Sequence, residues 1–267
     1  MPKTSSHPRH FIIVGVLVTV VTVLLDWLLD SALPLPVKAS IEAVTIDWLI
    51  GLHVLIISFL LALVVVFMLY AIVVFRKREG DETDGEHFEG NTTLEVLWTV
   101  VPLILVVIFA FIGIRTLNDI TKVEDNEVVI NATGQQWAWS FDYGNGVISD
   151  TLTLPVNQRV HMVLHSKDVI HSFFVPEFRV KQDAVPGRET DLHFTPTMTS
   201  VDYLATEGKE GKELKVRCAE LCGLSHWSME APVKVVPKSE FTAWLHNEMV
   251  KINPALTKQV ATNKTSN

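Results

Sequence analysis

The 267-residue sequence contains only two cysteines, Cys218 and Cys222. Structural zinc sites more often have cysteines two to four residues apart with a second pair downstream, and the absence of a second pair disfavours this class of site. No internal repeat and no nucleic-acid-binding motif occurs along the chain. The residues around the two cysteines must therefore decide whether they form a disulfide or bind a metal by another arrangement.

Charge is absent from two long stretches. Trp48–Phe75 and Val96–Ile114 contain no Asp, Glu, Lys or Arg over 28 and 19 residues. At about 1.5 Å per residue, each can cross a hydrocarbon layer of about 30 Å as a helix. Buried helices of a soluble core are usually shorter and amphipathic. We therefore predict membrane spans at about 48–75 and 96–114, within a helical hairpin over residues 40–117.

A third apolar stretch, Phe11–Leu25, is only 15 residues long and follows a basic start. This length is typical of a signal-peptide core, and small residues precede a possible cleavage point before Ser40. Extended through Leu29, the same stretch is long enough for a retained span. Residues 1–39 are therefore either a signal peptide or an extra transmembrane helix, and both alternatives stay open.

The charges that flank the spans predict the orientation. Arg76, Lys77 and Arg78 close the first long run, which places that end on the cytoplasmic side. The second run returns the chain, so the residues after Leu117 lie on the outer side of an inner or plasma membrane. Over residues 118–250, 19 Asp and Glu against 12 Lys and Arg give a net charge of −7. This excess indicates either a solvated surface or a docking face for a basic protein.

Residues 118–250 consist of short runs rich in β-branched and aromatic residues, separated by Gly- and Pro-containing turns. The predicted strands are 127–133, 136–141, 159–164, 191–194, 201–204, 214–217 and 232–236. Many short strands predict a β-sandwich or Greek-key barrel. A helix over 238–250 follows, with Phe241, Trp244, Leu245 and Met249 on one side, and residues 251–267 form a polar tail.

The segment Cys218-Ala-Glu-Leu-Cys222-Gly-Leu-Ser-His226-Trp-Ser-Met229 places two thiols, an imidazole and a thioether within 12 residues. Such soft ligands favour copper over calcium, magnesium or manganese. A blue-copper site uses one cysteine, two histidines and a long axial methionine. The additional cysteine here suits two copper ions that are bridged by both sulfurs.

Two other interpretations of this segment are weaker. Its spacing also matches one face of a helix, but Gly223, Ser225 and Ser228 are poor residues for a helix interior, so a compact loop is favoured. A disulfide would be compatible with an oxidising outer compartment. It would, however, leave His226 and Met229 without a joint role.

A pair of copper ions needs a second histidine from elsewhere in the chain. His171 is the best candidate because the apolar residues around it, within 168–176, would hold its ring rigidly at the end of a strand. Taken alone, however, a histidine among apolar residues is more often a core histidine, and this interpretation holds for His161, His165 and His193. His171 is separated from them mainly by the resemblance described next.

The pattern C-x-E-x-C-G-x-x-H-x-x-M follows His171-Ser-Phe-Phe-Val-Pro176 and Lys181–Arg188 in this chain. Together with Asn91–Pro102 and Gly134–Ser140, these motifs resemble cytochrome c oxidase subunit II, the haem–copper oxidase subunit with a dinuclear copper (CuA) centre. The resemblance runs from about residue 45 to residue 250. It implies that the outer domain is a cupredoxin-like Greek-key β-barrel behind the transmembrane hairpin.

The resemblance also implies a ligand set for two copper ions. Cys218 and Cys222 would bridge both ions, and His171 and His226 would bind one ion each. Met229 would be a weak axial ligand. The main-chain carbonyl of Glu220 would be the other axial ligand, with its carboxylate on a magnesium ion shared with subunit I.

Trp137 matches the tryptophan through which electrons arrive from cytochrome c, and Glu95 matches a carboxylate at the mouth of a proton pathway in subunit I. The resemblance thus implies cytochrome-c oxidase activity of the complex. Electrons would pass one at a time from a cytochrome c-type donor through the copper pair to haem in subunit I. There oxygen would be reduced to water, coupled to proton translocation. Further oxidase subunits are implied partners.

Ala138 departs from the tyrosine that is common at this position of the family, which leaves Trp137 in place. No C-x-x-C-H motif follows the barrel, so the donor is expected to be a separate protein. The alternative function is a membrane-tethered copper-binding or copper-delivery protein with no role in electron transfer. That function would leave Trp137 and the motif around Glu95 unexplained.

Overall fold

The computed structural model describes residues 7–77, 79–80, 89–207 and 213–254. It divides into two compact units. A helical unit comprises residues 1–35 and 47–112, and a β-rich unit comprises residues 36–46 and 113–267.

Three helices are long and apolar enough to cross a membrane: α1 (His7–Ala32), α2 (Ile41–Val74) and α3 (Thr92–Thr121). The two predicted spans lie within α2 and α3, and each helix continues beyond its uncharged run. Asn91 caps α3, because its side-chain oxygen accepts a hydrogen bond of 3.1 Å from the amide of Leu94. The chain is therefore a membrane protein with apolar helices before its β-rich unit.

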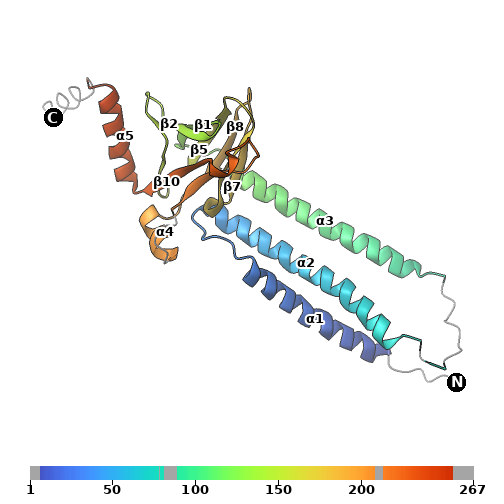
Figure 1. Cartoon of the computed structure of the whole chain (residues 1–267). Helices are drawn as coiled ribbons and strands as arrows, with labels where there is room; N and C mark the ends of the chain where they lie inside the picture. Colours follow the sequence, from blue (N-terminus) through green and yellow to red (C-terminus); the bar gives the residue numbers. More distant parts are fainter. Residues whose placement is uncertain (1–6, 78, 81–88, 208–212, 255–267) are drawn as a thin grey trace. The chain divides into compact units, whose positions relative to one another are not determined.

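Helix α1 packs along α2 in the helical unit (Figure 1). Val14 and Val18 are buried against Ala62 and Val66. At one end, the His10 ring lies 2.6 Å from the Tyr70 hydroxyl. The predicted choice between a signal peptide and an extra span concerns processing of the chain and stays a prediction.

The β-rich unit is a curled, cupredoxin-like sandwich of two five-stranded sheets. One sheet has the order β3 (Ile148–Ser149), β2 (Ala138–Asp142), β1 (Val128–Gln135), β5 (Val160–Ser166), β8 (Thr190–Phe194). The other has the order β4 (Leu152–Pro155), β10 (Glu230–Val236), β9 (Lys215–Cys218), β6 (His171–Val175), β7 (Val180–Ala184). Their apolar faces bury Phe141, Leu154, Met162 and Phe173 completely. The Greek-key connection of the strands stays a prediction.

The strand predicted at 201–204 is wrong, because helix α4 (Ser200–Glu207) occupies these residues. Thr199 caps it: its hydroxyl accepts from the Asp202 amide at 3.2 Å, and the Asp202 carboxylate accepts from the Thr199 amide at 3.2 Å. This reciprocal cap stabilises the first turn of a helix. Strands β3, β4 and β7 were not predicted, and β6 was expected only as the strand at whose end His171 lies.

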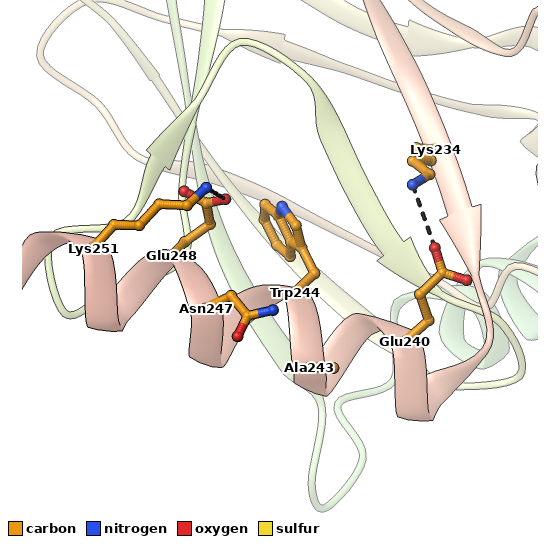
Figure 2. A pocket seen from close by; sticks show the side chains of 7 residues that line it. All are labelled: Lys234, Glu240, Ala243, Trp244, Asn247, Glu248 and Lys251. Atoms are coloured by element: carbon orange, nitrogen blue, oxygen red, sulfur yellow. Dashed lines mark hydrogen bonds and ion pairs between the residues drawn. The ribbon is translucent and has the colours of Figure 1, made fainter. Parts of the chain in front are cut away.

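The predicted C-terminal helix is confirmed as α5 (Lys238–Ile252). Phe241 is buried, and the other apolar residues of the predicted face pack against the core. Figure 2 shows Trp244 pointing from α5 toward the strands, where its ring lies 4.9 Å from that of Tyr143. The ion pairs Lys234–Glu240 and Lys251–Glu248 line the same surface pocket. Most of the predicted polar tail, residues 255–267, lies outside the described residues.

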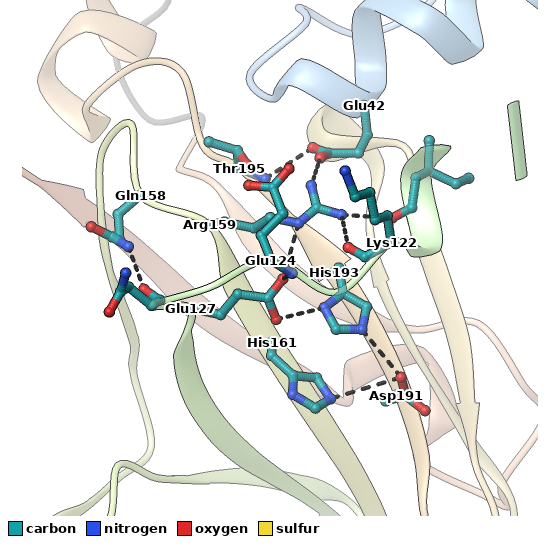
Figure 3. A network of polar contacts seen from close by, with 12 residues as sticks. Glu42, Lys122, Glu124, Glu127, Gln158, Arg159, His161, Asp191, His193 and Thr195 are labelled. Atoms are coloured by element: carbon teal, nitrogen blue, oxygen red, sulfur yellow. Dashed lines mark hydrogen bonds and ion pairs between the residues drawn. The ribbon is translucent and has the colours of Figure 1, made fainter. Parts of the chain in front are cut away.

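Within the β-rich unit, a buried arginine contacts the first turn of α2 and the chain at the end of α3 (Figure 3). The guanidinium of Arg159 lies 2.9 Å from the carboxylate of Glu42 in the first turn of α2 and 3.1 Å from that of Glu127. It also donates to the carbonyl oxygens of Ile120 and Lys122, both at 2.9 Å, at the end of α3. A planar guanidinium is suited to several such partners at once.

Candidate metal centre

Strand pairing brings the histidine and cysteine segments together. Strands β6 and β9 are antiparallel, with Phe173 opposite Cys218. Beyond this pair, the amide of Ala219 donates to the carbonyl of Ser172 at 3.0 Å. The amide of Cys218 donates to the carbonyl of Met229 at 3.1 Å. His171, at the start of β6, therefore meets both ends of the loop between β9 and β10.

The loop over residues 219–229 is compact and not an α-helix, as predicted. It contains one short 3-10 turn, His226–Ser228. The amide of His226 donates to the carbonyl of Gly223 at 3.2 Å. Gly223 has a φ of +124°, a conformation that residues with a side chain rarely adopt. The turn folds His226 and Met229 back toward the cysteines.

Five soft ligand atoms lie in a continuous cluster. The Sγ atoms of Cys218 and Cys222 are 3.7 Å apart. Cys218 Sγ lies 3.9 Å from Nδ1 of His171. Cys222 Sγ lies 3.6 Å from Nδ1 of His226 and 3.8 Å from Sδ of Met229. The structure thus brings together all five predicted side-chain ligands.

Three of the five ligand residues lie in the protein interior, while Cys218 and His226 are partly exposed. His171 is fully buried, and Cys222 and Met229 are only 3% and 1% exposed. Both cysteines are free thiols, since their separation far exceeds the roughly 2.05 Å of a disulfide bond. Burial, together with the neighbouring Cys218 thiol, raises the pKa of Cys222 to about 11. A metal that binds here must therefore displace thiol protons.

A carboxylate orients the His171 ring. Nε2 of His171 lies 2.8 Å from Oδ1 of Asp168. Burial acts to raise the pKa of Asp168, but hydrogen bonds from the Gln136 amide and the His171 ring dominate and lower it to about 2. An ionised carboxylate only accepts, so Nε2 carries the proton and Nδ1 presents its lone pair to the thiols. Asp168 was not among the predicted site residues, and its position three residues before His171 was the signal.

The absence of a side chain at Gly134 of β1 leaves the space that the His171 ring occupies. A methyl group on Gly134 would lie 2.9 Å from Cδ2 of His171 and 3.2 Å from the ring of Trp139. Such a contact is too short for any residue with a side chain. The close approach of β1 therefore restricts the position of the imidazole.

Trp137 lies next to the cysteine loop and is 37% exposed. A methyl group on Gly223 would meet its indole at 3.3 Å, so the ring packs directly against this loop. The neighbouring Gln136 donates from Nε2 to the carbonyl of Cys222 at 2.6 Å. Trp137 is thus partly exposed to solvent and packs against Gly223, the residue that follows Cys222.

The remaining two predicted residues differ in location. The main-chain carbonyl of Glu220 accepts a hydrogen bond from the Cys218 thiol at 3.2 Å, and its side chain is exposed. Glu95 lies in the first turn of α3, in the helical unit, and is not part of this cluster. The cluster itself provides two thiols, two imidazole nitrogens and a thioether, a donor set that fits copper and does not fit a hard cation.

Comparisons with known proteins identify the family of the chain. Residues 146–236 match the family model "Cytochrome C oxidase subunit II, periplasmic domain", and residues 29–116 match the corresponding transmembrane domain. Cytochrome c oxidase subunit 2 of Cereibacter sphaeroides is 30% identical over 78% of this chain and 77% of its own length. The Synechocystis protein of that name is 27% identical, with coverage of 88% and 80%.

Among solved structures, the periplasmic domain of subunit II of cytochrome oxidase from Bradyrhizobium japonicum is 30% identical. The match covers 49% of this chain and 99% of that domain, with a TM-score of 0.41. Both family models and relatives along most of the chain agree. The chain therefore belongs to the cytochrome c oxidase subunit II family.

Proposed function

We propose that the chain accepts electrons one at a time from a cytochrome c-type donor and passes them to haem in subunit I of a haem–copper oxidase. Oxygen reduction to water and the coupled proton translocation belong to the complex. The observation that carries this proposal is the cluster of five ligand atoms with neighbouring separations of 3.6–3.9 Å, in which His171, Cys222 and Met229 are buried.

The cluster is suited to two copper ions. The thiolates of Cys218 and Cys222 would bridge them, with one imidazole from His171 or His226 for each ion. Met229 Sδ and the Glu220 carbonyl would be the weak axial ligands. Two copper ions that share charge through two thiolates supply one-electron redox chemistry with little rearrangement.

Burial supports electron transfer over copper delivery. A delivery site needs exposed, exchangeable ligands, whereas His171 and Met229 are at most 1% exposed. Asp168 and Gly134 hold the His171 ring in one orientation. Outer partners of this kind fix ligand geometry and tune the properties of a metal.

Trp137 is the proposed point at which electrons arrive. Its indole combines partial exposure with packing against Gly223, beside Cys222. The donor would dock over this ring, attracted by the net charge of −7 over residues 118–250. The exposed Glu220 carboxylate would hold magnesium together with subunit I. Glu95 would lie at the mouth of a proton pathway of that subunit.

The predicted organisation completes the proposal. Residues 40–117 hold two spans, and the metal-binding domain over 118–250, with Greek-key connections, faces the outer side. Arg76 and Lys77 at the end of α2 support this orientation. We propose that α1 stays in the mature chain as a third span, because Val14 and Val18 are buried against α2. The mass of the purified mature chain tests this point.

The electron-transfer role is tested with the copper-loaded full chain in detergent. Reduced cytochrome c is mixed with the oxidised chain, and haem oxidation is followed by stopped-flow absorbance. Trp137→Phe should slow this step at least about tenfold without loss of copper. Trp227→Phe, a change of the same type on a loop residue that is 83% exposed, is the matched control. Equal rates for both variants would contradict the proposed route.

A further inference from the structure

A second group of metal-ligand side chains lies in the other sheet of the β-rich unit (Figure 3). His161 of β5 and His193 of β8 are directly opposite each other in the antiparallel pair. Their rings stack with centroids 4.4 Å apart and an interplanar angle of 19°. Ligand atoms of Glu127, His161 and His193 all lie within 4.8 Å of one another.

Asp191 lies at the tips of both rings. Its Oδ2 is 3.3 Å from Nε2 of His193 and 3.7 Å from Nε2 of His161. In a tetrahedral zinc site with bonds of about 2.0–2.2 Å, neighbouring ligand atoms are about 3.3 Å apart. The separations of Asp191 Oδ2 from the two imidazole nitrogens are therefore close to those around one zinc ion. A bound ion would also require the two stacked rings to turn, so that both Nε2 lone pairs meet it.

Glu127 is better placed to orient His193 than to bind the metal itself. Oε2 of Glu127 lies 2.9 Å from Nδ1 of His193, while Oε1 accepts from Arg159 Nε at 3.1 Å and from the Glu124 amide at 2.8 Å. The Glu127 carboxylate therefore holds the Nδ1 edge of the His193 ring and leaves Nε2 for a metal ion. A histidine whose far nitrogen donates to a carboxylate is the usual arrangement of a zinc ligand.

The two Nε2 atoms both face the Asp191 carboxylate. Nε2 of His193 lies 3.3 Å from Asp191 Oδ2, which is the spacing of two ligand atoms on one zinc ion. Nε2 of His161 is buried and makes no hydrogen bond to any residue that the structure describes. The Asp191 side chain is 60% exposed, which leaves an approach for an ion and for a water ligand.

We propose that His161 Nε2, His193 Nε2 and Asp191 Oδ2 bind a divalent transition-metal ion, zinc in the first instance, with water as the fourth ligand. The ion ties β5 to β8 beside the Arg159 network. This site is separate from the thiol cluster and does not depend on the electron-transfer role.

Zinc binding is measured on the full chain in detergent, with Cys218→Ser and Cys222→Ser introduced so that the thiol cluster does not compete. Calorimetric titration with zinc chloride alone should give one zinc ion per chain. In this background His161→Gln should weaken binding about tenfold or more, and Asp191→Asn should have a similar effect. His165→Gln, on the same strand and 34% exposed, is the matched control and should change the affinity less than twofold.

Unfolding temperatures of the zinc-free variants show whether each chain is folded. His161 is partly exposed, so His161→Gln is expected to keep the unfolding temperature of its parent. Zinc should raise that temperature in the parent and not in His161→Gln. Absence of a bound ion in the folded parent, or equal affinities for the His161→Gln and His165→Gln chains, would overturn the proposal and leave an ion-paired histidine cluster only.

Discussion

The β-rich unit contains two clusters of possible metal ligands, one around His171 and the thiols and the other around His161 and His193. In each, a carboxylate holds the far nitrogen of a buried histidine, Asp168 on His171 at 2.8 Å and Glu127 on His193 at 2.9 Å. The nitrogen that is left faces thiols in one cluster, where copper fits. In the other it faces a second imidazole and the Asp191 carboxylate, where zinc fits. Both clusters thus use a carboxylate to orient a histidine, and the ligand atoms that face this histidine determine which metal ion is favoured.

The largest expected effect comes from removing a bridging thiol. Cys218→Ser should abolish the dinuclear centre, because a hydroxyl does not replace a bridging thiolate between two copper ions. Electron acceptance from reduced cytochrome c should fall about a hundredfold or more. Zinc binding at His161 and His193 should be unaffected. A Cys218→Ser chain that kept two copper ions would break the comparison.

The next largest effect is expected from removal of Arg159, and it concerns the stability of the fold. Arg159→Met leaves the carboxylates of Glu42 and Glu127 without their cation, and loss of one partner from a buried ion pair costs about 3–5 kcal/mol. The free energy of unfolding, from denaturant titration followed by tryptophan fluorescence, should fall by this amount.

The matched control for this loss is Arg217→Met. The side chain of Arg217 is 54% exposed and pairs only loosely with Glu230 at 3.5 Å. Its removal should cost less than about 1 kcal/mol. Similar losses for both variants would show that Arg159 does not join the helix ends to the sheet.

The orienting carboxylates provide a smaller and symmetric test. Asp168→Asn should weaken copper binding about 10- to 100-fold and leave zinc affinity unchanged, and Glu127→Gln should do the reverse. Competition with a chelator of known affinity measures both constants. If either variant altered both metals equally, the two clusters would not be independent.

The smallest effect is expected at Gly134. In Gly134→Ala the new methyl group would lie 2.9 Å from the His171 ring, so the ring or β1 must shift by a few tenths of an ångström. We expect a cost of about 1 kcal/mol, which is about a fivefold loss of copper affinity, and a changed copper spectrum. Gly15→Ala, where nothing lies within 4 Å of the added methyl group, is the control and should leave both quantities unchanged.

The features that could be predicted from the sequence are those that depend on residues close together along the chain. The uncharged runs within α2 and α3, the compact loop from Cys218 to Met229, and the apolar face of α5 each depend on local spacing. His171 was also predicted as a ligand, although only the family resemblance separated it from the other histidines.

The remaining features depend on register between distant strands. His161 and His193 are 32 residues apart in the sequence and meet only because β5 and β8 pair with these residues opposite each other. Arg159 contacts Glu42 across 117 residues. The run 201–204 alternates like a strand, but the cap at Thr199 and Asp202 makes it a helix. Neither strand register nor this competition between local signals can be derived from spacing alone.

The central claim is that this subunit II holds a pair of copper ions that share one electron. It is tested most directly by the electron paramagnetic resonance spectrum and copper content of the copper-loaded full chain with His161→Gln, so that only the thiol cluster contributes. The account predicts two copper ions per chain and a seven-line hyperfine pattern from one electron shared over both. One copper ion with an ordinary four-line signal, or a disulfide between Cys218 and Cys222 that prevents copper binding, would contradict it.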